Sequence, residues 1–591
     1  MKPKPKPKHD LFNDTWAATD ALGRTLPGWE ECGSPRSDRF VGIFYFIANN
    51  YTGPDSPSDV SKIIAANPQD PAFIPGKSHF WGEPEPGYYR SADRWVIRRH
   101  AYQLADAGVD TLIFDVTNDV TFPEVHGAVC EVFEQVRKEG EATPDVCFLA
   151  SERSIQLLWD ELYSKERYKD LWFEWKGKPL LIFGQWEKRG DMNQVVLPDH
   201  IQEFFTIRKS WAWDSLSWYG EEGYHRWPWV AHYPQPIGWD QPGVAEMVPV
   251  AIGQHPLSNI GRSFHQGHQP PTDIYDRTTF TDQGLHFAEQ WQRALEVDPE
   301  FIFITGWNEW TAGSAVCVDP SQPALQALWD FFPDAILGRA GKILKPGDRY
   351  FIDQYNQEYS RDAEPMRGGH TDNYYYQMVA GIRRFKGVRP LPKTSPAQTI
   401  DLEGSFDQWV TVQPEYRDHQ FDTLPRNELG WGGLGPLIQT SGRNEFVRFK
   451  VSHDQKNLYF LAETRQPVTP STDPNWMLLF LNTDQRKETG WEGYDYVINF
   501  PVVDGKRTMV KKNLGGWSWR EMGEAAYRVD GCRLMIAVPK ALVGLAYLPA
   551  KFDFHWADNL QNPGDLEDFL TQGDSAPNRC FDYRYMEGTH D

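Results

Sequence analysis

The sequence predicts an α/β protein: a (β/α)8 TIM-type barrel followed by a β-sandwich domain. Apolar runs of β-forming residues alternate with amphipathic helical stretches between about residues 40 and 340, which is typical of a barrel. The last of these runs ends abruptly in polar and aromatic residues. Short alternating runs separated by Gly, Asp, Asn and Pro after about residue 400 predict the sandwich. The length of 591 residues accommodates both folds.

Eight apolar runs are the expected barrel strands, at residues 39–46, 110–118, 145–151, 179–185, 203–209, 229–233, 247–254 and 301–307. Helical periodicity appears at residues 94–107, 124–138, 154–163 and 281–295, and Gly108 supplies a C-cap signal after the first. Helices near residues 213–223 and after residue 256 are poorly marked. An open doubly wound sheet is the alternative, but no glycine-rich phosphate fingerprint follows the first strand.

Four regions are expected along the chain. Residues 1–38 form an N-terminal extension, and residues 39–387 form the barrel with its C-terminal extension. Residues 388–398 contain three prolines and are interpreted as a linker. Residues 399–591 form the β-sandwich, for which eight strands are expected, at residues 446–451, 457–462, 476–482, 494–500, 508–512, 526–529, 532–538 and 551–557.

Composition excludes several classes of partner. The net charge is −22 and no basic stripe is present, so we expect no nucleic-acid partner. No apolar run approaches ~18 residues, so we expect no membrane span. The six cysteines are widely spaced without a CxxC motif, which argues against a structural zinc site. The first residues lack the hydrophobic region of a signal peptide, so a mature secreted or periplasmic protein, which we expect, and a cytoplasmic one look alike here.

The most informative segment is residues 301–314, FIFITGWNEWTAGS. It places Trp307, Asn308, Glu309 and Trp310 where a buried strand leaves its sheet, and catalytic groups of barrels come from the C-terminal ends of the strands. A carboxylate between two indoles suits sugar chemistry, because the charge can act on the glycosidic bond and the flat rings can hold pyranoses. The alternative is a strand end with a capping Glu and two core indoles.

Two further strand ends carry carboxylates. Asp115 closes the second strand and Glu152 follows the third. Hydrolysis of a glycosidic bond needs two carboxyl groups, one that protonates the leaving oxygen and one that stays ionised. We therefore expect Glu309 to be catalytic with Asp115 as its partner. Asp115 could instead be a structural acid, and Glu152, followed by Arg153, also fits a surface ion pair.

Other expected substrate-binding residues lie in loops. The loop 78–90 follows the first strand, where barrels bind substrate, although it also fits a solvated loop. Histidines recur near later strand ends, and we expect hydrogen bonds to sugar hydroxyls rather than metal binding. Residues 353–373 are densely polar and aromatic, so they either cover the barrel mouth or dock the second domain. The loop and histidine candidates are His79, Trp81, Glu85, Tyr88, His232 and His255.

The motif Trp307-Asn308-Glu309-Trp310, with VGIFYF in the first strand and AGVDTLIFDVTN around Asp115, resembles the glycoside hydrolase family 99-like superfamily. That superfamily contains endo-α-mannosidases and the WbsX-like proteins of bacterial polysaccharide loci. The resemblance covers roughly residues 40–340 and implies a barrel acting on glycans. In the family motif, N-E-W-H-E-G, two glutamates work together. Glu309 matches the first of them, but the second position here is Ala312.

The C-terminal half is similar to a family 9-type carbohydrate-binding module, most closely at residues 400–409, IDLEGSFDQW. This resemblance implies sugar stacking on Trp517, Trp519 and Trp556. It also implies a structural Ca²⁺ near residues 482–484 and Asp495. The alternative is a sandwich that only buttresses the barrel.

Together these observations predict a glycoside hydrolase that cleaves a polysaccharide or glycan with a carboxylate pair and needs no catalytic cofactor or metal. The first rival is a non-catalytic glycan-binding protein that has lost the second carboxylate at Ala312. The second is a polysaccharide-biosynthesis transferase, but the sequence lacks a phosphate-cradling loop and a DxD-like metal motif in the barrel.

Overall fold

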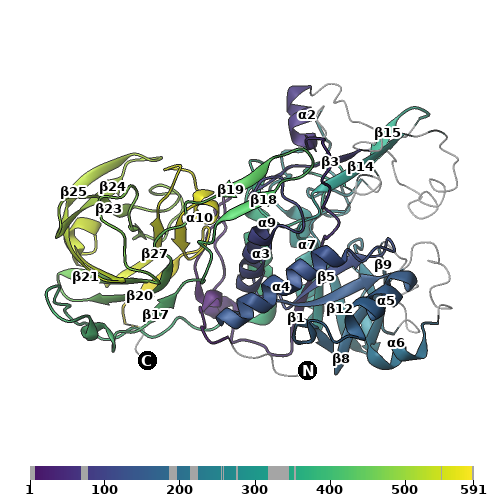
Figure 1. Cartoon of the computed structure of the whole chain (residues 1–591), viewed down its shortest axis with the longest axis horizontal. Coiled ribbons are helices and arrows are strands. Elements are labelled where there is room, and N and C mark those ends of the chain that lie inside the picture. Colours follow the sequence, from purple (N-terminus) through teal and green to yellow (C-terminus); the bar gives the residue numbers. More distant parts are fainter. Residues whose placement is uncertain are drawn as a thin grey trace.

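The computed structural model describes residues 7–67, 77–184, 196–212, 224–254, 256, 259–273, 277–316, 318, 345–351, 354–547 and 549–588. A largely parallel sheet lies in the first part of the chain and an antiparallel sheet in the last part. In Figure 1 the parallel sheet lies at the lower right and the antiparallel sheet at the left. No helix among these residues is both long and apolar enough to cross a membrane.

Eight parallel strands form a nearly closed barrel, with neighbours in the order β10-β9-β8-β6-β5-β1-β13-β12. A short strand, β11 (Gly238–Gln241), pairs antiparallel with β12, and the backbone N–H of His225 donates to Trp239 O at 2.9 Å beside the start of β10. The gap between the two ends of the sheet is therefore narrow. The barrel strands are β1 (Phe40–Tyr45), β5 (Thr111–Val116), β6 (Asp145–Ala150), β8 (Lys178–Phe183), β9 (Thr206–Ala212), β10 (Arg226–Trp229), β12 (Val244–Ala251) and β13 (Phe301–Thr305).

The sequence places all eight strands, but three are displaced by a few residues. The run expected to begin at residue 203 first completes a short helix, α6 (Asp199–Phe204), which buries Ile201, and β9 follows. The strand expected at 229–233 is β10, which ends at Trp229 because Val230 has a positive φ of 46°. The strand expected at 247–254 is β12 and ends at Ala251.

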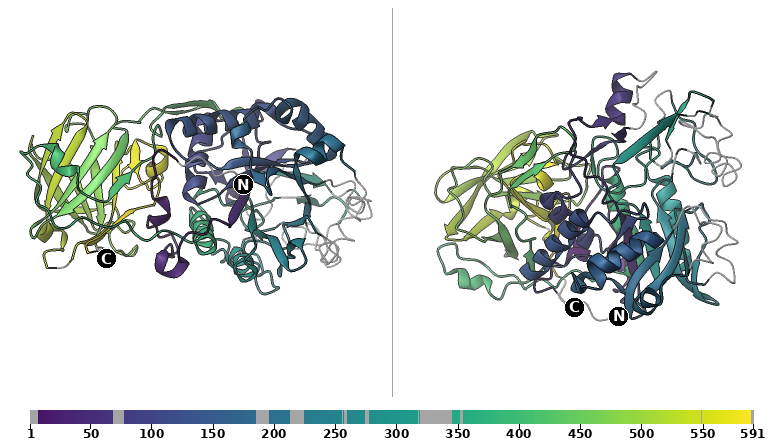
Figure 2. Two further views of the ribbon diagram at one scale, coloured as in Figure 1. Left: turned by 90° about the horizontal axis from the view of Figure 1, so that it is seen from below. Right: turned by 45° about the vertical axis from the view of Figure 1, so that its right-hand side comes forward.

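Helices cover the outer face of the barrel. They are α3 (Arg94–Asp106), α4 (Pro123–Glu139), α5 (Glu152–Leu158), α7 (Leu285–Val297) and α9 (Asn373–Lys386). Asp93 caps α3 by accepting hydrogen bonds from two backbone N–H groups of its first turn. Pro123 begins α4, and Gly140 ends it with a φ of 106° that favours glycine. The left view of Figure 2 shows helices on the side of the parallel sheet that borders the antiparallel one.

The barrel interior is packed with large side chains, including Phe44, Ile113, Leu149, Trp229 and Phe303. Its N-terminal end is closed by a buried ion pair between Arg208 and Glu246 at 2.5 Å, and the indoles of Trp175 and Trp227 also donate to Glu246. Because this end is filled, a site on the barrel has to lie at the C-terminal ends of the strands.

Beyond the C-terminal end of the barrel lies a small four-stranded sheet in the order β15-β14-β3-β2. In Figure 1 it projects at the upper right, above the barrel. The segment that follows β13 continues directly into β14, and β14 pairs with β3 from the loop after β1. The strands are β2 (Ser58–Asp59), β3 (Ser78–Phe80), β14 (Thr311–Val316) and β15 (Arg349–Phe351), and helix α2 (Val60–Ala66) follows β2.

The C-terminal sheet has eleven antiparallel strands and folds over on itself around an aromatic core. Phe449 of β20 stacks on Trp556 of β27 at 5.7 Å between ring centroids, although these strands are not neighbours in the sheet. This packing agrees with the sandwich expectation. The strands are β17 (Glu415–Arg417), β20 (Phe446–His453), β21 (Asn457–Thr464), β22 (Leu478–Asn482), β23 (Tyr496–Val502), β24 (Arg507–Asn513), β25 (Trp519–Asp530), β26 (Arg533–Pro539), β27 (Lys551–Asp558), β28 (Asp574–Ala576) and β29 (Tyr583–Met586).

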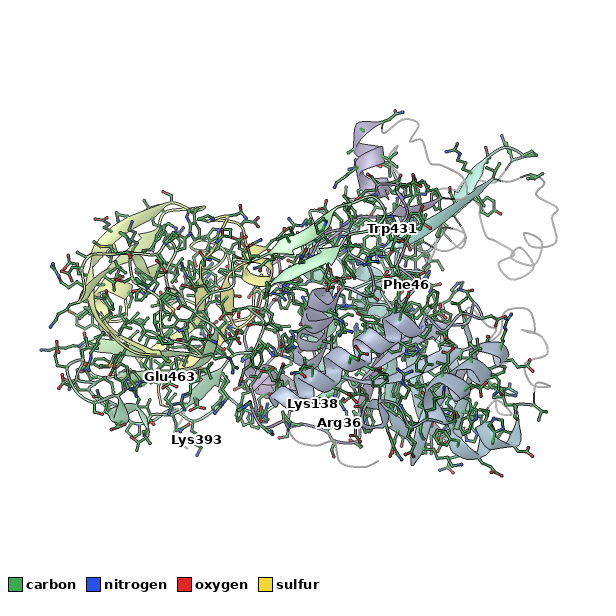
Figure 3. All side chains as sticks on the ribbon, in the orientation of Figure 1. Arg36, Phe46, Lys138, Lys393, Trp431 and Glu463 are labelled. Carbon is green, nitrogen blue, oxygen red and sulfur yellow. The ribbon has the colours of Figure 1, made fainter. Side chains whose placement is uncertain are left out.

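The two sheets are joined by buried ion pairs. Arg579 beside β28 pairs with Glu85 of the barrel loop, and Arg426 of β18 (Arg426–Leu429) pairs with Asp93 at 2.6 Å. The hairpin of β18 and β19 (Pro436–Gln439) lies against the loop after β1, and Figure 3 shows Trp431, between these strands, on the barrel side of the C-terminal sheet. Residues 387–400, which include the expected linker, have no regular secondary structure.

Candidate active site at the C-terminal end of the barrel

Glu309 lies just beyond β13, in a turn that neighbouring segments hold in place. The backbone N–H of Trp307 donates to Phe44 O of β1 at 2.9 Å. The side-chain amide of Asn308 accepts from Phe46 N–H at 2.7 Å and donates to Phe46 O at 3.1 Å. Phe46 is labelled in Figure 3, at the level where the barrel strands end. The first strand therefore fixes the position of the Trp-Asn-Glu-Trp segment.

A second segment, residues 361–364, runs beside this turn from the other side. Gly306 N–H donates to Arg361 O at 2.5 Å, and the N–H groups of Ala363 and Glu364 donate to Gly306 O and Trp307 O at 3.0 Å each. The polar stretch 353–373 thus packs at the end of β13 rather than serving only as a docking surface. Asp353 lies outside the described residues, and the stretch from Gln354 onward is described.

Arg361 forms an ion pair with Glu309, with 2.9 Å between Nη2 and Oε2. The side chain of Glu309 is 8% exposed and that of Arg361 is 3% exposed. Arg361 also donates to Gln254 O, which follows β12, at 3.2 Å. A guanidinium at this distance favours the charged form of a carboxylate. The arrangement therefore suits a carboxylate that works as a base, a nucleophile or a stabiliser of positive charge.

Asp362 is a third element of this arrangement. Its Oδ1 accepts the backbone N–H of Glu309 at 2.9 Å, and its Oδ2 accepts from Gln354 Nε2 at 3.0 Å. Burial raises the pKa of the Asp362 carboxyl. Because both oxygens are engaged with the Glu309 turn and its supporting segment, Asp362 positions Glu309.

Glu364 organises a buried network next to this turn. Its Oε2 accepts from Trp310 Nε1 at 2.5 Å and from the Tyr89 hydroxyl at 2.6 Å. Its Oε1 lies 2.9 Å from His100 Nε2, and His100 Nδ1 lies 2.9 Å from the Tyr45 hydroxyl. All five side chains are buried. The network joins β1, α3 and the loop 78–90 below the Glu309 turn.

The tryptophans of the motif are core residues in this structure. Trp307, Trp310 and Trp81 are each 0% exposed. Trp310 stacks on Trp81 with 4.3 Å between ring centroids, and Trp81 Nε1 donates to Glu309 O at 2.8 Å. They stabilise the turn that carries Glu309, and none offers an open ring face to a sugar. Their packing therefore matches the alternative interpretation of the sequence, in which the two indoles of the motif are core residues.

Asp115 lies at the same end of the barrel. It is the one partly exposed residue of β5, and by alternation it shares the inward face with Ile113 of the barrel interior. Its Oδ1 accepts from the backbone N–H and the hydroxyl of Thr117 at 2.9 and 2.8 Å. Strand β1 separates β5 from β13 in the sheet. Asp115 and Glu309 therefore come from strands on either side of β1.

The other expected carboxylates have different surroundings. Glu152 is in the first turn of α5, where a negative charge stabilises the helix dipole. Glu85 is buried and ion-paired with Arg579 of the C-terminal region, with 2.9 Å between its Oε2 and Arg579 Nε. Burial raises the pKa of Glu85. Glu85 thus links the barrel region to the C-terminal region, and we do not include it among the substrate-binding residues.

The remaining candidates that the structure describes have three different surroundings. His79 is buried in β3 opposite Ala312 of β14, and burial lowers its pKa to about 4. The Tyr88 hydroxyl donates to Asp59 Oδ2 at 2.5 Å and accepts from Lys62 Nζ at 2.7 Å, and its ring packs against the buried cluster that contains Trp310. His232 follows β10 and is exposed. His255 lies outside the described residues.

Sequence reasoning missed the residues that hold Glu309. Arg361, Asp362 and Glu364 lie about fifty residues further along the chain, and the segment has neither helical nor strand periodicity. The available signal was the density of charged and aromatic residues in 353–373, which indicated a packed segment without showing what it packs against.

The eight parallel strands, their covering helices and the carboxylate at a strand end define the class as a TIM-like α/β barrel, here with a separate antiparallel β-region. No family model matches the chain, and no curated protein matches it. Two solved structures of a GH99 endo-alpha-mannosidase from Bacteroides thetaiotaomicron are similar at 15% identity, covering 60% of this chain and 98% and 99% of theirs, with TM-scores of 0.33 and 0.32. A glycoside hydrolase-like protein matches at 10% identity, covering 49% of this chain and 88% of its own, with a TM-score of 0.26. Similarity at this level carries no functional argument.

Proposed function

We propose that this protein is a glycoside hydrolase that acts on a polysaccharide or another glycan at the C-terminal end of its barrel. One observation carries the proposal: Glu309 is held at the end of β13 by backbone contacts from β1 and from residues 361–364, and Arg361 compensates its charge. Such fixed geometry is what a catalytic carboxylate needs, because small displacements of a reacting group are costly.

The second carboxyl group of the proposed mechanism is Asp115. It comes from the same end of the barrel and is partly exposed, so it can reach a bound sugar. In this assignment Glu309 stays ionised as nucleophile or base, and Asp115 supplies the proton to the leaving oxygen. A separation of about 5–5.5 Å between the two carboxyl groups in a substrate complex would indicate retention of configuration, and about 6.5–9.5 Å inversion.

The test is incubation of the purified protein with plant, algal and microbial polysaccharides, followed by chromatography of the released sugars. Glu309→Gln removes the charge but keeps the shape. The matched control is Glu296→Gln on the exposed face of α7. We expect release by the wild type and by Glu296→Gln, and none by Glu309→Gln. Equal release by all three proteins would remove Glu309 from the mechanism.

A non-catalytic glycan-binding protein is the second candidate, and Ala312 favours it. Ala312 is 3% exposed and lies within β14, so it supplies no carboxyl group where the resembling family has its second glutamate. Binding of a glycan without release of sugar, unchanged by Glu309→Gln, would favour this candidate over the hydrolase.

Glycan binding by the C-terminal region stays a prediction for two of the three tryptophans that are expected to stack on sugars. Trp556 is 0% exposed and stacked on Phe449, so it is part of the core and cannot stack on a sugar in this structure. Trp517 and Trp519 are partly buried, 5.6 Å apart between ring centroids. Loss of binding to an insoluble polysaccharide in Trp517→Ala would support a sugar site there.

A further inference from the structure

Three buried aspartates of the C-terminal region lie close together outside the barrel. Asp418 and Asp422 belong to the loop that follows β17, and Asp574 begins β28. They are 1%, 5% and 3% exposed. Each offers a carboxylate oxygen, and these oxygens lie within 4.8 Å of one another. Among the described residues this is the one group of three or more acidic, His or Cys side chains with such spacing.

Each of the three carboxylates has one oxygen that is held by a donor. The other oxygen of each (Asp418 Oδ2, Asp422 Oδ1 and Asp574 Oδ1) is buried and has no hydrogen-bond partner in the described part of the chain. A buried carboxylate oxygen without a partner is costly, and three of them within one group of neighbouring aspartates need an explanation. The donors to the engaged oxygens are His419 N–H at 2.9 Å, Asn578 Nδ2 at 3.0 Å and Phe446 N–H at 2.6 Å.

The three carboxylates repel one another when they are ionised. Burial and the neighbouring carboxylates, including Glu445, raise the pKa of Asp418 and of Asp574 well above the usual range. The same causes raise the pKa of Asp422 to about 7, although His419 and Arg99 act in the opposite sense. A divalent cation among the three oxygens would reverse this repulsion and keep all three carboxylates ionised.

The loop that carries Asp418 and Asp422 is held in place by contacts with the helices of the barrel. The positions of the two aspartates are therefore fixed by the tertiary structure. Between the two aspartates, His419 is in contact with Asp106 of α3 and Glu141 beyond α4, and its ring stacks on Tyr102 at 4.1 Å. The Tyr102 hydroxyl donates to Gln420 O at 2.6 Å, and Arg99 donates to Asp422 O at 2.9 Å. These contacts place the loop between the two sheets.

We propose that Asp418, Asp422 and Asp574 bind one Ca²⁺ ion, which ties the loop after β17 to β28 where the C-terminal sheet meets the barrel. A ligand set made only of carboxylate oxygens suits a hard cation, and Ca²⁺ accepts several carboxylates with water in the remaining positions. Zn²⁺ would require His or Cys ligands. The site is distinct from residues 482–484 and Asp495, where the resemblance to a carbohydrate-binding module implies Ca²⁺ and where Asp495 Oδ2 accepts from the N–H and hydroxyl of Thr483.

The test uses the full chain, stripped with EDTA and dialysed. Ca²⁺ is then added, binding is measured by calorimetry, bound metal by elemental analysis, and Tm by scanning fluorimetry. We expect one Ca²⁺ per chain at this site and a rise in Tm of several degrees. Asp422→Asn and Asp574→Asn should lose this ion and its effect on Tm. Asp530→Asn, at the exposed end of β25, should behave as wild type.

A second readout protects the test against variants that merely fold poorly. Without metal, each Asp→Asn change replaces a carboxyl group whose ionisation the neighbouring carboxylates disfavour by a neutral amide of the same shape, so the Tm of Asp422→Asn and Asp574→Asn in EDTA should equal or exceed that of the wild type. Absence of bound Ca²⁺ and of any Tm shift in the wild type would overturn the proposal. So would full retention of Ca²⁺ by both variants, which would put the ion elsewhere. A Tm rise with Mg²⁺ equal to that with Ca²⁺ would overturn the assignment to Ca²⁺.

Discussion

Arg361 Nη2 lies 2.9 Å from Glu309 Oε2, so two buried side chains 52 residues apart in the chain form one ion pair at the C-terminal end of β13. The backbone of Arg361 also pairs with Gly306, at the start of the turn that carries Glu309. Charge compensation and position of the carboxylate therefore come from the same segment.

We predict that Arg361→Met destabilises the protein by about 3–5 kcal/mol, because it removes the cation from the buried ion pair with Glu309. The double variant Glu309→Gln/Arg361→Met should cost less than Arg361→Met alone. Urea unfolding followed by tryptophan fluorescence measures both. Lys506→Met is the control, since Lys506 and its partner Glu403 are exposed, and its urea midpoint should not change. Equal midpoints for Arg361→Met and wild type would refute the prediction.

We predict that Asp115→Asn lowers the rate of sugar release by about 10²–10⁴ while the urea midpoint stays close to that of the wild type. The amide keeps an oxygen for the Thr117 contacts but cannot donate the proton of a general acid. Glu152→Gln, in the first turn of α5, is the control and should retain the rate. Full activity of Asp115→Asn would show that Asp115 is not the general acid and only accepts hydrogen bonds from Thr117.

The barrel should not fold well without the C-terminal region. A chain ending at residue 387 lacks Arg579 and Arg426, the cations that pair with Glu85 and Asp93, and it loses the apolar contact of Trp431 with the loop after β1. We expect this truncated chain to be insoluble or to unfold without a cooperative transition. Soluble expression with a Tm near that of the full chain would show that the two regions are independent.

Within the full chain, Arg579→Met should increase cleavage in residues 387–400 during limited proteolysis, because it weakens the contact between the two sheets. Glu85→Gln/Arg579→Met should restore part of the resistance, since no unpaired charge is then buried at Glu85. Cleavage of Arg579→Met at the wild-type rate would contradict the role of this ion pair.

Two buried histidines should contribute less to stability as the pH decreases from about 6.5 toward 4. Burial and then Arg167 lower the pKa of His126 to about 4, and burial and then His232 lower that of His286 to about 3. At these two side chains the unfolded chain, with a His pKa near 6.5, binds more protons than the folded one in this window, so their contribution to the free energy of unfolding falls as the pH decreases. Urea midpoints of the wild type and His126→Leu at pH 7, 6 and 5 measure this contribution, and the midpoint of the wild type should decrease relative to that of His126→Leu. A constant difference between the two midpoints would contradict the assignment.

The barrel strands were accessible to sequence analysis because burial on both faces leaves continuous apolar runs, as at residues 145–150. The residues at which the strands begin and end could be predicted less well from the sequence. Strand β10 ends where Val230 adopts a positive φ, and Phe204 belongs to a helix whose apolar residue Ile201 packs inward. Neither feature has a signal in the period-2 pattern, since each depends on what the segment packs against.

The same contrast holds for the candidate site. The motif at residues 307–310 identifies Glu309 as an acid at a strand end, whereas the burial of Trp81, Trp307 and Trp310 depends on neighbours supplied by other segments. Glu85 illustrates the point most directly: the sequence places it in a substrate-binding loop, and the folded chain pairs it with Arg579, 494 residues away. A sequence pattern carries no information about such distant partners.

The sequence by itself determined the class of fold, the order of the barrel strands and the carboxylates at their ends. Periodicity and the residue types at strand ends depend only on residues that are close together in the chain. Only the tertiary structure decided that Arg361 compensates Glu309, that Asp362 holds its backbone, and that three aspartates from two distant segments share one buried space. The physical reason is that charge compensation and burial depend on distances in space, which the chain sets only when its remote segments pack together.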